Sequence, residues 1–178
     1  MKLTMFILLL IVTISCTKEK VKPQVNSSIE GSELPAQESW NSTIFFSDSG
    51  KMKAIMYAGH LRVFSDSKET LIDSGLKVDF FNMDEIKTTT LTSKRGKVDE
   101  KTDNLYAIDS VVAANDSGVV IVTDMMMWRN HDRKIVSDKF VRIESPHEII
   151  EGYGFESDQQ LRNYVIYNIT YITTPEKK

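Results

Sequence analysis

A short repeated pattern constrains the fold of this chain more than any other feature of its sequence. Five times between Leu91 and Phe155, an apolar residue is followed by one spacer and then by a small residue. The copies begin 14, 16, 14 and 15 residues apart, at Leu91, Leu105, Ile121, Ile135 and Ile150. This period fits one strand plus one turn and is too short for a pair of helices. The pattern therefore predicts a long antiparallel meander.

The segments on either side of the repeat also favour strands. Residues 76–81 alternate between apolar and polar side chains, 164–171 are rich in β-branched and aromatic residues, and 52–64 suggests two strands broken near Gly59. Residues 119–122 and 125–128 are apolar on both faces, although no long amphipathic helix is predicted to cover them. We therefore expect an all-β domain, either a sandwich or a rolled sheet whose interior stays partly open.

The N-terminus has the composition of a bacterial lipoprotein signal. Lys2 provides the positive charge, residues 5–12 provide a short apolar run, and residues 13–16 (Thr-Ile-Ser-Cys) resemble a lipobox, with threonine where leucine is usual. The resemblance implies cleavage before Cys16, the only cysteine of the 178 residues, and acylation of its thiol and new amine. The alternatives are an uncleaved membrane anchor or an ordinary secretory signal.

The expected domain organisation follows from this start. Residues 1–15 are predicted to be the lipoprotein signal peptide, and residues 16–39 a lipidated flexible tether, because a polar segment without periodicity buries too little apolar surface to fold. Residues 40–174 are predicted to form the β-domain.

Composition and motifs argue against several other functions. The formal charge of −3 gives no excess of positive charge for nucleic acid, and no phosphate-binding loop is present. His60, His131 and His147 lie in separate turns or strand ends, so neither a metal site nor another cofactor is predicted. Three aspartates recur in the repeat at 109, 124 and 138; they are either a paired-carboxylate hydrolase site or ordinary strand-end residues.

Several segments in a fixed order resemble the LptC family of periplasmic lipopolysaccharide-export proteins and the wider LptA-like, organic-solvent-tolerance superfamily. The resemblance covers about residues 40–171 and rests on residues 91–99, 105–107, 111–112, 116–118, 123 with 128, 135–137 with 141, and 152–158. It implies an open, V-shaped antiparallel β-jelly-roll with an apolar groove between two sheets. A lipid anchor differs from the best-known pattern, in which the family keeps an N-terminal transmembrane helix.

The resemblance also implies a function and partners. The domain would accept the acyl chains of lipid A, the lipid part of lipopolysaccharide, from an inner-membrane ABC transporter complex through the first strands. It would pass them to a periplasmic LptA-like bridge protein through 164–171, without acting as an enzyme. Its place would be the periplasmic face of the inner membrane, with the outer membrane as the alternative. The other hypothesis is a lipid-anchored envelope scaffold or carbohydrate-active enzyme.

The repeat predicts which apolar residues line the groove. Three consecutive methionines suit either a slot for flexible hydrocarbon chains or ordinary packing in the core and at its edge. The predicted lipopolysaccharide-groove residues are Leu105, Val111, Ile121, Met125, Met127, Ile135, Val141 and Phe155.

Overall fold

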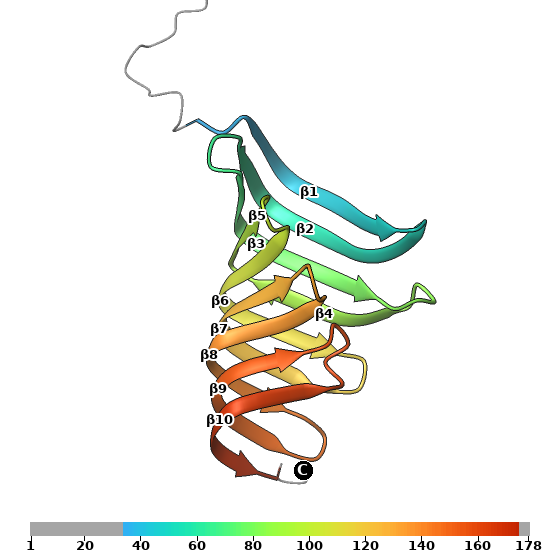
Figure 1. Ribbon diagram of the computed structural model, residues 1–178, viewed down its shortest axis with the longest axis vertical. Coiled ribbons are helices and arrows are strands. Elements are labelled where there is room, and N and C mark those ends of the chain that lie inside the picture. The colour runs from blue at the N-terminus through green and yellow to red at the C-terminus, as the bar shows by residue number, and fades with distance from the viewer. Residues whose placement is uncertain (1–33, 175–178) are drawn as a thin grey trace, which may run out of the picture. The chain divides into compact units, whose positions relative to one another are not determined.

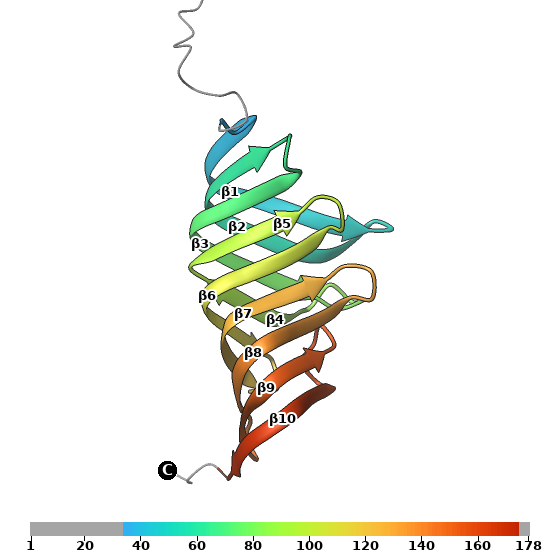
Figure 2. The same cartoon turned by 60° about the vertical axis from the view of Figure 1, so that its left-hand side comes forward.

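The computed structural model describes residues 34–174, and every regular element in this range is a β-strand. The ten strands form one antiparallel sheet in the order β1-β2-β3-β4-β6-β7-β8-β9-β10, with β5 paired to β3 and β6. Figures 1 and 2 show them stacked from β1 to β10. Their bounds are β1 (Gln37–Asp48), β2 (Lys51–Phe64), β3 (Glu69–Phe81), β4 (Lys87–Ser93), β5 (Arg95–Asp99), β6 (Asn104–Asn115), β7 (Val120–Arg129), β8 (Lys134–Glu144), β9 (Ile149–Ser157) and β10 (Tyr164–Thr173). The prediction of an all-β, jelly-roll-like fold is confirmed.

Most of the strands bend near their middle. The pairing register shifts between Ala58 and His60 on β2, and the equivalent shifts recur on β6, β7 and β8. Each shift is a β-bulge, which bends a strand and increases its twist. We call the row of bends the fold line; it runs through Gly59, Ser74, Lys94, Asp109, Asp124, Asp138 and Gly154.

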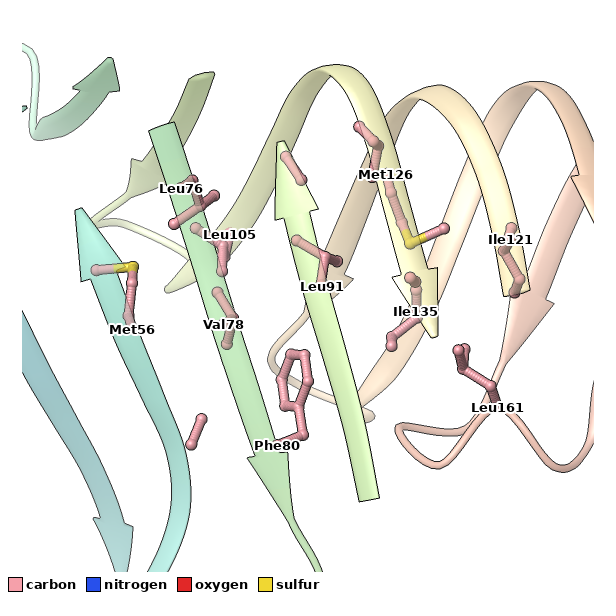
Figure 3. Close-up of a cluster of buried hydrophobic side chains, with 14 of the residues drawn as sticks. Met56, Leu76, Val78, Phe80, Leu91, Leu105, Ile121, Met126, Ile135 and Leu161 are labelled. Carbon is pink, nitrogen blue, oxygen red and sulfur yellow. The ribbon is translucent and has the colours of Figure 1, made fainter. Parts of the chain in front are cut away.

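The fold line divides the sheet into two walls that face each other. β4 and β5, separated only by Lys94, are two halves of one bent strand. The β4 wall contains β4 with 42–48, 51–58, 76–81, 111–115, 120–123, 141–144, 149–152 and 169–173, and the β5 wall contains β5 with 37–40, 60–64, 69–73, 104–108, 126–129, 134–137, 155–157 and 164–166. The buried apolar side chains of both walls form one core cluster, part of which is shown in Figure 3.

The small residue of the sequence repeat is the last inward-facing residue before the bend. Ala107, Thr123 and Ser137 are 1, 5 and 7 % exposed, and the apolar residue two positions earlier is also buried in each case. Where the walls converge there is little room for a side chain, so only small residues fit. The hydroxyls have a second role, because they replace ladder hydrogen bonds: Thr123 Oγ1 donates to the carbonyl of Phe140 at 2.8 Å, and Ser137 Oγ donates to that of Met125 at 2.7 Å.

Glycine meets the steric demand at the fold line in two strands. A Cβ on Gly59 would lie 2.1 Å from the carbonyl oxygen of Ser74, and a Cβ on Gly152 would lie 2.4 Å from that of Asn168. Gly154 has a φ of +76°, a left-handed conformation that glycine adopts without strain. The glycines of 152–155 thus serve a bend and a close backbone approach.

Two sequence predictions need adjustment. Residues 52–64 form one strand that bends at Gly59 instead of two strands, because the shift in pairing with β3 at this point bends the ladder without ending it. β1 begins at Gln37, and the backbone N–H of Ala36 already donates to the carbonyl of Val63 at 2.7 Å. The described sheet therefore starts inside the segment predicted as tether, and residues 1–33, with Cys16 and the signal peptide, lie outside the described residues.

Candidate functional site

The candidate site is the apolar slot between the two walls. Six of the eight residues predicted for the groove belong to the core cluster: Leu105 is 8 % exposed, and Val111, Ile121, Ile135, Val141 and Phe155 are 0 or 1 % exposed. Their cross-strand partners are also inward-facing, as in the pairs Ala113–Ile121 and Ile121–Ile143. The sequence repeat therefore identified the face of the sheet that lines the interior.

The two methionines of the predicted set do not face the interior. Met126 is 1 % exposed in the core cluster, whereas Met125 and Met127 are half-buried and pair with the outward-facing Ile108 and Tyr106. The reason is the bend after Thr123, where two residues, Asp124 and Met125, separate the buried Thr123 from the buried Met126, so that the alternation of inward and outward side chains changes phase along β7. The prediction of Met125 and Met127 as inward-facing is wrong, and Met126 takes that place.

Part of the slot is hollow. A cavity of about 70 Å³ lies between the walls, with Met56, Val78 and Phe80 on one side and Leu105 and Trp128 on the other. It borders a more polar pocket of about 190 Å³, which shares Trp128 and also contains the side chains of Asn130 and Arg133. The smaller cavity has the volume of about two water molecules, so a whole acyl chain enters only if side chains or a loop move.

Contacts between the two walls close much of the open side opposite the fold line, which we call the mouth. Arg133 pairs with Asp48 at 3.1 Å, and the hydroxyl of Tyr164 donates to Glu148 Oε1 at 3.1 Å. Burial and this hydrogen bond raise the pKa of the Tyr164 hydroxyl. A third contact is made by the loop of residues 158–163 between β9 and β10, which crosses from the β5 wall to β4 and the β6–β7 turn. The mouth is thus held by a few side-chain contacts.

The end strands leave interior apolar surface uncovered. On β1, Phe46 pairs with the buried Ala54 and is 43 % exposed. On β10, Ile169 pairs with the buried Gly152 and is 50 % exposed, and Ile172 is 58 % exposed. Directly paired residues lie on the same face of a sheet, so these side chains face the interior, and no further strand of the described part of the chain covers them. The slot is therefore open at both ends of the strand order.

The charged side chains around the β7–β8 turn are paired with one another. Arg129 contacts Asp132 and Glu156, and Lys134 also contacts Glu156, which keeps the β7–β8 turn close to neutral. The hydrogen bond from Arg129 lowers the pKa of Asp132 to about 2.

The aspartates of the repeat lie at bends. Asp109 has a φ of +65° and pairs with Arg95 at 2.7 Å, while Asp124 and Asp138 are exposed on the outside of the fold line. Aspartate tolerates the conformations of bends and strand ends, which explains its recurrence without catalysis.

His60 lies between two carboxylates on the outer face of the first three strands. Its Nε2 is 2.7 Å from Glu38 Oε1 on β1, and its Nδ1 is 2.7 Å from Asp73 Oδ1 on β3. Trp40 stacks on the imidazole, with ring centroids 5.0 Å apart. The hydrogen bonds to Glu38 and Asp73 raise the pKa of His60. The arrangement ties β1 to the sheet, and residues 34–174 contain no cluster of three or more metal-ligating side chains.

Sequence reasoning missed two features of the site. Met56-Tyr57-Ala58 is another copy of the repeated pattern, with both Met56 and Ala58 2 % exposed. This copy could have been recognised in the sequence, because it lies directly before Gly59. Leu161 was not detectable, because its segment has no strand pattern and it is buried only by contacts with distant residues.

A match to one protein-family model agrees with this architecture. The model of the LptC family, described as lipopolysaccharide-assembly, LptC-related, matches residues 3–173, nearly the whole chain. The comparison with curated proteins finds no match. Among residues 34–174 there is no helix long and apolar enough to cross a bilayer.

The family match answers the question of enzyme or transport component. LptC proteins are non-enzymatic components of lipopolysaccharide transport that work in the periplasm in association with the inner membrane. The hypothesis of a carbohydrate-active enzyme is therefore set aside. With a rolled antiparallel sheet, an apolar slot and a family match over nearly its full length, the chain belongs to the LptC-related family of lipopolysaccharide-assembly proteins.

Proposed function

We propose that this chain conducts lipid A through its slot by holding the acyl chains between the β4 and β5 walls. The observation that carries the proposal is the uncovered interior at both end strands, where Phe46 and Ile169 are about half exposed although they face inward. An exposed CH₂ group costs about 0.8 kcal/mol in water, so a continuous apolar slot lowers the barrier to moving acyl chains between membranes. The predicted groove residues around Ile121 form the centre of this path.

The partners follow from the two free edges. Within residues 34–174, β1 and β10 each have one side without a neighbouring strand, and such an edge pairs readily with a strand of another protein. We assign β1 to the inner-membrane ABC transporter complex and β10 to the periplasmic LptA-like bridge protein. Pairing at these edges covers Phe46 and Ile169 and aligns the slot with those of its neighbours.

The anchor completes the proposal. Acylation of Cys16 holds the domain at the periplasmic face of the inner membrane, and the residues before β1 serve as the tether. Replacing Cys16 with serine is expected to move the protein from the membrane fraction to the soluble periplasmic fraction. Membrane retention of the Cys16→Ser protein would show that the segment before it anchors the chain by itself.

A photo-crosslinking experiment tests the conduit. A photoreactive phenylalanine analogue is placed at Phe46 or Ile169, which face the interior, and at Phe45 or Tyr171 as outward-facing controls of similar exposure. We expect lipopolysaccharide adducts at the two interior positions only. Equal adduct yields at Phe45 and Phe46, or none at either interior position, would contradict transport through the slot.

A further inference from the structure

We propose that residues 158–163 form a displaceable strap across the slot, and that Leu161 occupies the place of a lipid acyl chain until one arrives. The inference rests on the proposed function and concerns its regulation. The strap connects β9 to β10 on the β5 wall and closes over the β4 wall.

Leu161 is the only buried side chain of the strap. It is 0 % exposed and belongs to the core cluster, while Arg162 and Asn163 beside it are exposed. Figure 3 shows it directed from the loop toward the side of the cluster that contains Ile121 and Ile135. A branched hydrocarbon thus fills interior volume next to the predicted groove residues, and a lipid acyl chain offers the same chemistry.

The strap is attached to the β4 wall by side-chain donors alone. Thr89 Oγ1 donates to the carbonyl of Gln159 at 2.8 Å, and Asn115 Nδ2 donates to that of Gln160 at 2.9 Å. Arg162 adds an ion pair of 3.3 Å with Asp116, which is screened because both groups are well exposed. Among the described residues, no backbone–backbone hydrogen bond links the strap to this wall. It can detach without breaking a strand ladder.

The backbone of the strap also favours release. Leu161 has a φ of +54°, a left-handed conformation that is strained for a leucine. The conformation is held by a turn in which the Leu161 N–H donates to the carbonyl of Asp158 at 3.2 Å and the Arg162 N–H donates to Asp158 Oδ1 at 3.0 Å. A strained conformation persists only where the surrounding structure over-determines it. Once Leu161 loses its packing in the slot, only the two hydrogen bonds to Asp158 hold this conformation, so the strap can relax when an arriving hydrocarbon takes the place of Leu161.

The test measures how fast a thiol at position 161 reacts with a maleimide. The full-length chain carries Cys16→Ser and Leu161→Cys, so that position 161 provides the only thiol. Ile121→Cys in the same background is the matched control, because Ile121 is also 0 % exposed but lies in the middle of a strand. Labelling is measured without ligand, with detergent-dispersed lipid A, and after Thr89→Val plus Arg162→Ala weaken the attachment.

We expect weakened attachment alone to speed labelling at position 161 by at least tenfold and to leave position 121 unchanged. Co-sedimentation shows whether lipid A binds. Where it binds, we expect it also to speed labelling at position 161 and to leave position 121 unchanged. The strap proposal would be refuted if lipid A bound without speeding the labelling of position 161. It would also be refuted if labelling of position 121 sped up by the same factor.

Absence of lipid A binding counts against the conduit and leaves the strap to be decided by the weakened variant. If Thr89→Val plus Arg162→Ala does not speed labelling at position 161, the strap is refuted whatever the lipid result.

Discussion

The hydroxyls at the fold line give the sharpest prediction about what holds this sheet in its bent form. Thr123 is 5 % exposed, and its hydroxyl donates to the Phe140 carbonyl at 2.8 Å where the β7–β8 ladder is interrupted. Thr123→Val keeps the shape of the side chain and removes the donor. The bond is part-buried, and losing a typical intramolecular hydrogen bond costs about 0.5–1.5 kcal/mol, so the free energy of unfolding should fall by about 1 kcal/mol.

The neighbouring serine makes the prediction more specific. Ser137 donates to the Met125 carbonyl at 2.7 Å, and Thr123 Oγ1 lies 3.4 Å from the same carbonyl and 3.4 Å from Ser137 Oγ. Thr123 can therefore partly replace Ser137 as a donor to Met125 in Ser137→Ala. The double variant should lose more than the sum of the single losses, with a coupling of about 0.5–1 kcal/mol.

Urea denaturation of the four proteins in this double-mutant cycle measures both quantities. Thr92→Val is the control, because Thr92 is half-buried and its hydrogen bond to the Val112 carbonyl is 3.4 Å long. It should change stability by less than about 0.5 kcal/mol. If Thr123→Val were as harmless as Thr92→Val, the hydroxyls would not be what replaces the missing ladder bonds, and the repeat would reflect side-chain volume alone.

Three further predictions follow from single positions. Gly59→Ala should destabilise the fold by about 2 kcal/mol or more in urea denaturation, since its Cβ meets the Ser74 carbonyl oxygen at 2.1 Å. Gly50→Ala is the comparison: its Cβ meets nothing within 4 Å, and its φ of +76° alone costs an alanine about 1 kcal/mol, so an equal or smaller loss for Gly59→Ala would contradict the steric argument. Leu161→Ala should cost about 3 kcal/mol, because it removes three buried carbons and leaves a cavity, and a loss under about 1 kcal/mol would mean that the strap is not packed. The pKa of His60 is raised in the folded state, so its stabilising effect is fully present below pH 6.5 and is lost as the pH rises through the raised value. Thermal denaturation should therefore show a loss of stability above pH 6.5. The His60→Gln variant should not show this loss.

Local sequence determined the secondary structure and one face of the sheet. β-branched and aromatic content with turn residues at a period of about 15 indicated strands throughout, and the apolar residue of each repeat, such as Leu105 or Ile135, is buried as expected. These features depend on neighbours within a few residues, which is the range over which propensity and alternation act. The order of the repeats was also enough to identify the family.

Only the tertiary structure decided which side chains face the interior after each bend and what closes the slot. The bend after Thr123 changes the phase of inward and outward side chains along β7 without a clear mark in the sequence, so Met126 took the position expected for Met125 and Met127. Leu161 is buried by a contact whose hydrogen bond joins Gln159 to Thr89, 70 residues apart. Such a contact exists only after the walls have closed, because the free energy that holds it comes from packing between distant segments and not from the local preference of the chain.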